Sequence, residues 1–385
     1  MCCRDAGDER PAAVAEDPFR QAERRQRTRL ALHPPDAVQR RHASSVPNVP
    51  PAELPFPPME AELVTELPES EDWQFEPKWD GFRGVVENLE GEVHVWSRNE
   101  RPLLRYFPEL AALGDELPPH SAVDGEIVIE TDGALDFDKL QMRLHPAESR
   151  VTKLSREIPA TFVAFDVLLW DGEQVHALPL EERRRRVEAL PFAVSPATLD
   201  TREARVWFDR LEVAGFDGVV AKRLGLPYLP GSREGVVKVK REQTADCVVM
   251  GVTWSEKGTG IASLMLGLYD DARELRHVGS ASIGKRREEV LPRVKPLLGE
   301  NPERRPRGEP SRWRPKVQLE WSPIPPELVA EVKYDKWQGA RIRHVAKFLR
   351  FRPDKEPEAC TFEQLRHEPK PGDPTVRDLL AGPRR

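Results

Sequence analysis

The chain has 385 residues, which is enough for two domains with separate hydrophobic cores. Its formal net charge is −6 at pH 7, which taken alone argues against a protein that binds nucleic acid. Because no apolar run is long enough to span a membrane and the N-terminus lacks the apolar core of a signal peptide, we expect a cytoplasmic protein with no membrane partner.

The charge is distributed unevenly along the chain. Residues 241–385 carry 28 basic and 22 acidic side chains, whereas the first 240 residues carry 31 and 43. This asymmetry indicates local contact with a polyanion through the C-terminal part. The four cysteines, at positions 2, 3, 247 and 360, are not at metal-ligand spacing, so we expect no zinc site and no disulfide framework.

Residues 1–50 form a predicted disordered extension, rich in Arg, Ala, Pro and Glu with little apolar periodicity. One interpretation is a flexible arm that contacts DNA. The other, which we favour because acids nearly balance the arginines, is a passive tail or a start codon assigned too far upstream.

Residues 51–240 follow a mostly β pattern interrupted by helices, so we expect an α+β domain. The expected elements, in chain order, are a hairpin over 85–97, a helix near 106–113, a strand over 122–129, a helix over 136–144, a buried strand over 162–169, helices over 180–190 and 203–214, and strands over 217–223 and 235–240. The four arginines at 183–186 are interpreted as a solvated helix face, with DNA contact as the alternative.

Residues 241–368 have a different pattern of short alternating strands with one inserted helix over 285–298. This pattern favours a small Greek-key barrel of the oligonucleotide-binding (OB) type, and the helix makes an SH3-like barrel less suitable. Residues 369–385, which contain Pro and Arg, are predicted to be a flexible tail.

Glu76-Pro77-Lys78-Trp79-Asp80-Gly81-Phe82-Arg83 is the stretch that points most clearly to chemistry. A lysine amine is a nucleophile only without its proton, so nearby cations must lower its pKa. Asp80 is a candidate to orient the amine, and Arg83 offers a planar fork for phosphate or a sugar hydroxyl. Alternation in the strand over 235–240 places Lys238 and Lys240 on one side, as an anion site requires.

Seven ordered motifs together resemble the covalent nucleotidyltransferase superfamily, which comprises ATP-dependent DNA ligases, RNA ligases and mRNA capping enzymes. The motifs are Lys78-Trp79-Asp80-Gly81, Ser97-Arg98-Asn99, Asp124-Gly125-Glu126, Ala164-Phe165-Asp166, Asp217-Gly218-Val219-Val220-Ala221-Lys222, Lys238-Val239-Lys240 and Arg350-Phe351-Arg352-Pro353-Asp354-Lys355. They look most like the compact bacterial ATP-dependent DNA ligases, including the stand-alone actinobacterial type. The resemblance covers about residues 51–365.

The resemblance implies a nucleotidyltransferase (adenylation) domain of ATP-grasp-like antiparallel sheets over 51–240 and an OB-fold domain over 241–368. It implies ATP as co-substrate, Mg²⁺ or Mn²⁺ as metal, and nicked double-stranded DNA as substrate of a monomeric enzyme that works with DNA-repair proteins. Lys78 would carry AMP, and Arg352, Asp354 and Lys355 would close over the pyrophosphate end of ATP.

The resemblance also assigns the remaining site residues. Lys238 and Lys240 would act on the α-phosphate, Glu126 would accept a bond from the ribose, Phe165 would stack on adenine, and Glu76 would contact the adenine amino group. Arg83 and Arg98 match ribose or phosphate contacts, Lys222 completes the nucleotide site, and Glu126 and Asp217 are candidate metal ligands. From the residues alone, a core role for Phe165 is equally consistent with its apolar strand.

Two departures from the family pattern are visible, namely Asp217 where glutamate is frequent, and Glu100 where glycine often follows Ser97-Arg98-Asn99. An RNA ligase or a capping guanylyltransferase is the alternative enzyme, and a non-catalytic nucleic-acid-binding module is the alternative from another class.

Overall fold

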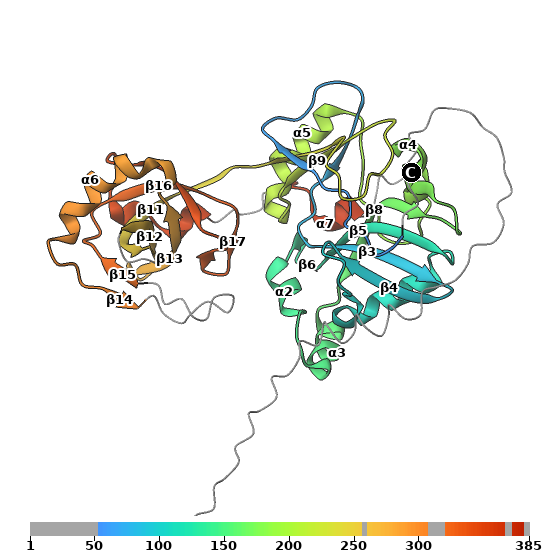
Figure 1. Cartoon of the computed structure of the whole chain (residues 1–385), viewed down its shortest axis with the longest axis horizontal. Coiled ribbons are helices and arrows are strands. Elements are labelled where there is room, and N and C mark those ends of the chain that lie inside the picture. The colour runs from blue at the N-terminus through green and yellow to red at the C-terminus, as the bar shows by residue number, and fades with distance from the viewer. Residues whose placement is uncertain (1–52, 256–259, 307–319, 366–371, 381–385) are drawn as a thin grey trace, which may run out of the picture.

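The computed structural model describes residues 53–255, 260–306, 320–365 and 372–380. The extension predicted over 1–50 therefore lies outside the described residues. Figure 1 shows two bodies side by side, one formed by the elements β1 to β10 together with α7 and the other by β11 to β19. No helix in the described parts is long and apolar enough to cross a membrane.

Two four-stranded sheets form the first domain. One has the order β1-β10-β9-β2 and the other β4-β3-β5-β8. The strands are β1 (Glu62–Val64), β2 (Trp73–Pro77), β3 (Phe82–Leu89), β4 (Glu92–Ser97), β5 (Ser121–Val128), β8 (Thr161–Leu169), β9 (Gly218–Arg223) and β10 (Val236–Lys240), with a short pair β6 (Glu130–Thr131) and β7 (Ala134–Leu135). The α+β class and the mainly antiparallel sheets agree with the prediction.

The predicted hairpin over 85–97 is present as β3 and β4. Its turn residues Glu90 and Gly91 have φ values of 53° and 95°. Two positive φ values in a two-residue turn match the right-handed twist of the flanking strands, which explains the tight connection. The strand β3 follows directly after the Lys78 loop, so Lys78 lies where the chain enters the hairpin, as expected.

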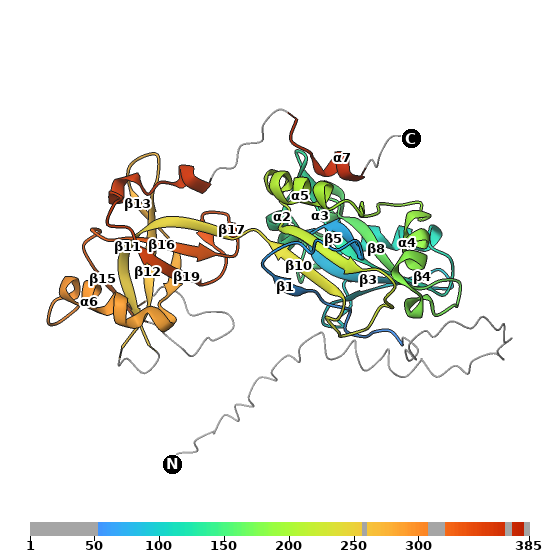
Figure 2. The same ribbon diagram turned by 90° about the horizontal axis from the view of Figure 1, so that it is seen from above.

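Helices cover the outer faces of the sheets (Figure 2). They are α2 (Phe137–Met142), α3 (Glu148–Glu157), α4 (Leu180–Glu188) and α5 (Thr201–Arg210). The helix predicted near 106–113 is a 3₁₀ segment, Pro108–Asp115, and α3 was not anticipated. After α5 a 3₁₀ turn ends at Gly215, whose φ of 82° suits glycine at a helix end.

One hydrophobic cluster joins the two sheets of the first domain. Phe75 of β2, Val163 of β8, Val219 of β9 and Trp207 of α5 belong to it, and all four are buried. A second cluster fills the space between the β4-β3-β5-β8 sheet and the helices beneath it. The packed layers fix the loop around Lys78 between the edges of the two sheets.

The second domain is a closed five-stranded barrel with the order β11-β12-β13-β19-β16, because β16 and β12 both pair with β11. Its strands are β11 (Gln243–Trp254), β12 (Ile261–Tyr269), β13 (Leu275–Ser282), β16 (Val329–Tyr334) and β19 (Ala346–Phe351), and α6 (Arg287–Leu298) follows β13. The short strands β14 (Arg305–Pro306) and β15 (Glu320–Pro323) extend β11, and β17 (Trp337–Gln338) pairs with β18 (Arg341–Ile342). The predicted OB-type barrel is confirmed.

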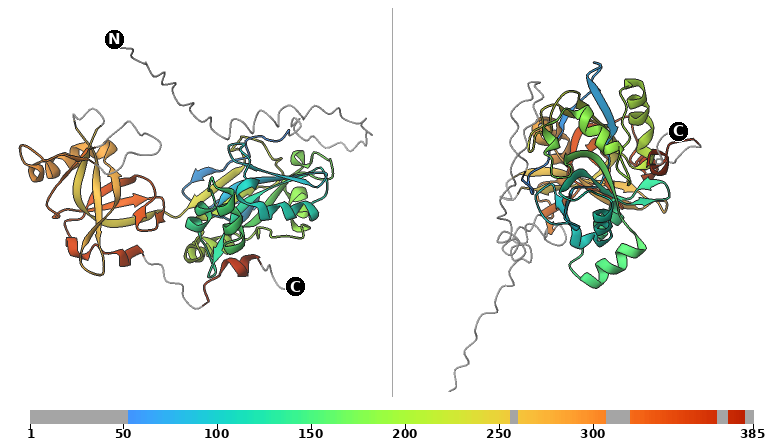
Figure 3. Two further views of the ribbon diagram at one scale, coloured as in Figure 1. Left: turned by 90° about the horizontal axis from the view of Figure 1, so that it is seen from below. Right: turned by 90° about the vertical axis from the view of Figure 1, so that its right-hand side faces the viewer.

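The C-terminal segment departs from the expected flexible tail. Residues Val376–Leu380 form α7, which lies against the first domain beside α5 (Figures 2 and 3). Val376 is fully buried in the cluster that joins the sheets, and Arg377 binds Glu130 at 3.0 Å. Arg210 of α5 contacts Asp373 at 3.1 Å. The chain therefore returns from the barrel to the first domain.

Candidate functional site

A cavity of about 270 Å³ opens between the two sheets of the first domain. Eight of the residues predicted from the motifs line it: Glu76, Lys78, Arg83, Arg98, Glu126, Phe165, Lys222 and Lys238. They come from β2 and the loop after it, β3, the turn after β4, β5, β8, β9 and β10, so the two sheets together assemble the site. Asp217, Lys240, Arg352 and Lys355 do not line the cavity as it is shaped here.

The Lys78 amine is held by Asp217. The Nζ of Lys78 lies 2.9 Å from Oδ2 of Asp217, and the Nζ of Lys240 lies 3.1 Å from the same oxygen. The backbone supports this contact, since Lys78 N donates to Gly218 O at 2.9 Å. Burial raises the pKa of Asp217, but Lys78 and Lys240 lower it more, so the net shift is downward and the carboxylate is ionised.

The interpretation of Asp80 as the group that orients the Lys78 amine is wrong. Asp80 is buried and pairs with Lys336 of the second domain, whereas Asp217 holds the amine. Gly81, the next residue, packs closely against β5. A Cβ at Gly81 would lie 2.2 Å from the backbone oxygen of Ile127, so glycine is required for contact with β5.

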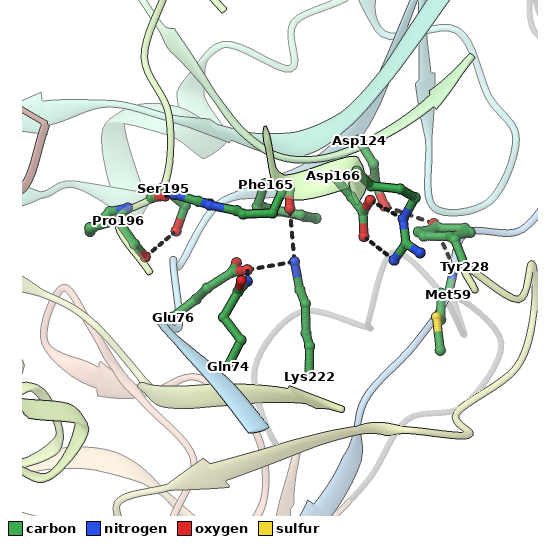
Figure 4. A network of polar contacts seen from close by, with 12 residues as sticks. Met59, Gln74, Glu76, Asp124, Phe165, Asp166, Ser195, Pro196, Lys222 and Tyr228 are labelled. Atoms are coloured by element: carbon green, nitrogen blue, oxygen red, sulfur yellow. Dashed lines mark hydrogen bonds and ion pairs between the residues drawn. The ribbon is translucent and has the colours of Figure 1, made fainter. Parts of the chain in front are cut away.

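Lys222 is a buried cation that ties three strands together (Figure 4). Its Nζ lies 2.8 Å from Oε1 of Glu76 and donates to the backbone oxygen of Phe165 at 2.9 Å. Gln74 also donates to Glu76 at 2.9 Å. Glu76 is only 3% exposed and therefore presents a fixed carboxylate at the end of the cavity.

Arg83 and Phe165 lie against each other in the lining of the cavity. The Nε of Arg83 donates to Asp124 at 2.6 Å, and its guanidinium carbon lies 4.5 Å from the centre of the Phe165 ring. Tyr228 donates to the same Asp124 at 2.7 Å, and Met59 N donates to the Tyr228 hydroxyl at 2.8 Å (Figure 4). This network holds the aromatic ring and the guanidinium in one orientation.

Glu126 lines the cavity, and its carboxyl group is a weaker acid than an ordinary glutamate. Burial raises its pKa to about 7, although Arg83 and Lys78 act in the opposite direction. Near neutral pH the group therefore exists in both protonation states. In either state it can accept a hydrogen bond from a sugar hydroxyl.

Lys238 is a cation of the cavity lining. Burial and the positive charges of Lys78 and Lys240 lower its pKa. Lys240, two residues later, has a raised pKa, because Asp217 and Asp335 outweigh the opposing effect of burial. Lys238 therefore lines the cavity, whereas Lys240 pairs with the carboxylates of Asp217 and Asp335.

Arg98 lies at the rim, where Glu60 joins it to a second cation. Glu60 binds Arg98 and also accepts from Arg233, at 2.7 Å from Nη2. Both arginines are well exposed and line the cavity. Arg233 was not predicted, and no motif marks it.

The interpretation of residues 183–186 as a solvated arginine face is wrong for the first two. Arg183 binds Asp166 at 2.7 Å with both side chains nearly inaccessible, and Arg184 donates to the backbone oxygen of Ser195 at 2.8 Å. The spacing of these residues could have indicated their burial. The buried positions of α4 recur at i, i+3, i+4 and i+7 and are Leu180, Arg183, Arg184 and Val187. Arg183 and Asp166 also line the cavity.

Arg352 and Lys355 lie together on the barrel, away from the cavity lining. Arg352 Nη1 lies 3.0 Å from Asp246 Oδ2, and Lys355 Nζ lies 2.9 Å from the same oxygen. Arg352 also binds Asp354 at 2.8 Å. In this arrangement both cations are paired with Asp246 of β11.

The described residues contain no group of three or more His, Cys, Asp or Glu side chains that could hold a metal ion. Mg²⁺ is usually held by one or two carboxylates together with phosphate oxygens and water. Glu126 lines the cavity and Asp217 pairs with Lys78, so both provide oxygen donors of that kind at the site and the residues present fit it.

A two-sheet domain with a lysine-lined cavity, followed by an oligonucleotide-binding barrel, is typical of enzymes that transfer nucleotides to nucleic-acid ends. The model of the ATP dependent DNA ligase domain matches residues 58–240, and that of the ATP dependent DNA ligase C terminal region matches residues 257–355.

Curated proteins similar to this chain are DNA ligases. DNA ligase C of Mycobacterium tuberculosis is 42% identical over 355 residues, covering 85% of this chain and 98% of that protein. DNA ligase C1 of Mycolicibacterium smegmatis is 44% identical over 336 residues, covering 82% and 95%. The multifunctional non-homologous end joining DNA repair protein LigD of M. tuberculosis is 31% identical over 299 residues, covering 76% of this chain and 37% of that protein.

The chain therefore belongs to the family of ATP-dependent DNA ligases, of the compact actinobacterial type. Ligases of this family use ATP and Mg²⁺ and act on nicked DNA. The alternatives of an RNA ligase, a capping enzyme and a non-catalytic binding module find no support in these relatives.

Proposed function

We propose that the enzyme joins 3′-hydroxyl and 5′-phosphate ends at nicks in duplex DNA through a covalent Lys78–AMP intermediate. The observation that carries the proposal is the Lys78 amine, held 2.9 Å from Asp217 at a cavity that contains Lys222 and Lys238. Only an amine in contact with the cavity can attack a nucleotide bound there.

The reaction has three steps. The Lys78 ammonium first gives up one proton, and the neutral amine attacks the α-phosphorus of ATP; the bond to the pyrophosphate oxygen breaks, and the nitrogen releases a second proton to solvent as the P–N bond forms. An oxygen of the DNA 5′-phosphate then attacks the same phosphorus, the P–N bond breaks, and the departing nitrogen takes up protons from solvent. Finally the DNA 3′-hydroxyl attacks the activated 5′-phosphate, loses its proton and expels AMP.

The cavity residues have distinct roles in this proposal. Lys238, with support from Lys240, contacts the α-phosphate and stabilises the charge that develops on its oxygens. Phe165 stacks on adenine while Glu76 accepts from the adenine amino group, and both are fixed by Lys222.

The sugar and the phosphates meet a second group of residues. Glu126 accepts from the ribose, and Arg98 and Arg83 contribute ribose or phosphate contacts from the rim and the wall of the cavity. Glu126 and Asp217 would hold the metal ion, which supplies positive charge at the phosphate oxygens.

Closure over ATP is assigned to Arg352, Asp354 and Lys355. These side chains reach the pyrophosphate end only if the barrel moves about the connection between β10 and β11, near Arg241. Two cations that are already paired with Asp246 could exchange that carboxylate for phosphate oxygens without becoming unpaired.

We further propose a role in DNA repair, in the cytoplasm, as a monomer that works with repair proteins. The name of the LigD relative, a non-homologous end joining DNA repair protein, supports the pathway. The cytoplasmic location is supported by the need of the enzyme for ATP and DNA.

Mass spectrometry of the protein after incubation with ATP and Mg²⁺ tests the proposal. We expect a mass increase of one AMP, mapped to Lys78 in the digest, and its disappearance when nicked DNA is added. Lys78→Arg keeps the charge and is the matched control, which should fold normally and carry no AMP. An adduct on another side chain, or none on the folded wild type, would refute the proposal.

A further inference from the structure

Glu76 is held by two donors that end on the same carboxylate oxygen (Figure 4). The amide nitrogen Nε2 of Gln74 donates to Oε1 of Glu76 at 2.9 Å, and the Nζ of Lys222 lies 2.8 Å from that oxygen. All three side chains are buried, so water competes little for these contacts. Gln74 belongs to none of the seven motifs named above, and its role is therefore a separate question.

The strand β2 determines where these groups lie. Side chains two positions apart share a face of a strand, so Gln74 and Glu76 lie on the same side of β2. In the antiparallel pairing of β2 with β9, Gln74 is directly opposite Lys222. The other edge of β2 is fixed as well, because the N–H and the carbonyl of Phe75 bond to Thr198 at 2.8 and 3.0 Å. The amide that donates to Glu76 therefore stands on backbone that is paired on both edges.

The lone pairs of Glu76 determine which of its oxygens is left for a ligand. Each oxygen of a carboxylate offers about two acceptor positions. Gln74 and Lys222 use both positions on Oε1, so Oε2 is the oxygen that remains available to the cavity, which Glu76 lines. The amide of Gln74 has only this orientation, because turning it round would bring its oxygen against Oε1 and two acceptors would meet.

Gln74 influences a bound base only through Glu76. Glu76, Lys222 and Phe165 line the cavity, whereas Gln74 is not part of the lining. The last torsion of a glutamate side chain is broad and roughly two-fold, so a carboxylate with a single donor can turn about that bond. A second donor on the same oxygen removes this freedom. Gln74 therefore fixes the direction in which Oε2 faces.

An oxygen fixed in this way distinguishes purine bases by the group at C6. Adenine carries an amino group there, and its N–H donates to a carboxylate oxygen. Guanine carries an oxygen, which would face a second negative oxygen, and a purine with only hydrogen at C6 leaves the carboxylate without that bond. A site built around a donor on the ligand rejects an analogue that lacks the donor, because the buried acceptor is then unpaired.

We propose that Gln74 is a positioning residue that sets the base specificity of the first step by directing Oε2 of Glu76 at the 6-amino group of ATP. The inference rests on the proposed function, because it requires the contact between Glu76 and the adenine amino group. It adds a residue outside the cavity lining to those that determine the choice of nucleotide.

The test compares ATP with purine riboside triphosphate, which lacks only the 6-amino group, in formation of the covalent nucleotide adduct by the full-length protein. Gln74→Met keeps the length of the side chain and removes the donor. Gln141→Met, an exposed change on α2, is the matched control. Wild type and control should prefer ATP in kcat/KM, and Gln74→Met should lower that preference about tenfold, through a higher KM for ATP. Its kcat with ATP and its kinetics with the analogue should stay within twofold of wild type.

The preference is a ratio measured on one preparation, so a smaller folded fraction in the variant does not change it. Equal losses with the two nucleotides in Gln74→Met would give Gln74 a purely structural role and overturn the inference, and so would an unchanged preference for ATP. A wild type that uses both nucleotides equally well would instead refute the contact between Glu76 and adenine in the proposed function.

Discussion

Lys78 and Asp217 are 139 positions apart in the sequence, yet the amine and the carboxylate lie 2.9 Å from each other. The antiparallel pairing of β2 with β9, in which Pro77 faces Val219, creates this contact. Asp217 also holds Lys240, so one carboxylate orders two lysines of the nucleotide site.

Asp217→Asn should slow adenylation of Lys78 by at least tenfold. The amide keeps the shape of the side chain but cannot balance two ammonium groups, so both amines lose their fixed positions. The rate of AMP incorporation in a single turnover measures the effect. Asp217→Glu restores the charge and should recover part of the rate, whereas equal losses in the two variants would argue against an electrostatic role.

Arg183→Met should destabilise the protein by about 3–5 kcal/mol, because it leaves the buried Asp166 without its ion-pair partner. Urea unfolding measures the change. Arg185→Met, on the exposed side of the same helix, should change the free energy of unfolding by no more than about 0.5 kcal/mol. Arg183→Met combined with Asp166→Leu should recover stability, and a double variant as unstable as the single one would contradict this explanation.

Glu126→Gln should stabilise the free enzyme at alkaline pH relative to the wild type. The folded pKa of Glu126, about 7, lies above the ordinary value of 4.5, so the folded chain binds this proton more tightly than the unfolded chain. Its contribution to stability is present below pH 4.5 and is lost as pH rises towards and through 7.

The difference in unfolding free energy between Glu126→Gln and wild type should therefore shift by up to ~3 kcal/mol in favour of the variant between pH 4.5 and 8. Urea unfolding at both pH values measures it. Glu182→Gln, an exposed change on α4, should show no such shift. A constant difference across this range would show that Glu126 titrates normally.

Lys355→Ala should impair adenylation of Lys78 more than it impairs sealing of a pre-adenylated nick. The reason is that the pyrophosphate end of ATP, which Lys355 is proposed to contact, is present only in the first step. Comparison of the two rates in the same preparation tests this expectation. Equal losses in both assays would mean that Lys355 has no special role in closure.

The local sequence pattern was sufficient to predict those parts of the site that lie within one strand or one turn. Alternation along β10 placed Lys238 and Lys240 on one side, and the Glu90-Gly91 turn marked the hairpin that follows Lys78. The inserted helix and the short strands after Arg241 indicated the barrel for the same reason.

Contacts between distant segments were not predictable in this way. The partner of Lys78 depends on the pairing of β2 with β9, and that of Asp80 depends on how two domains meet. The burial of Arg183 could have been recognised from its helical spacing with Leu180 and Val187. The pattern was missed because a run of arginines is more often a solvent-exposed helix face. The helix α7 is too short to have a periodic signal, and its position depends on Val376 entering a core made by other segments.

The attachment of α7 to the first domain gives the two domains a second covalent connection besides the one between β10 and β11. Only residues 366–371 lie between Leu365 on the barrel side and Gly372, and a chain of that length spans at most roughly 25 Å when fully extended. A rotation of the barrel that needs a longer reach must first pull Val376 out of its core. While α7 stays attached, the length of this segment therefore sets an upper limit on how far the barrel can move from the first domain.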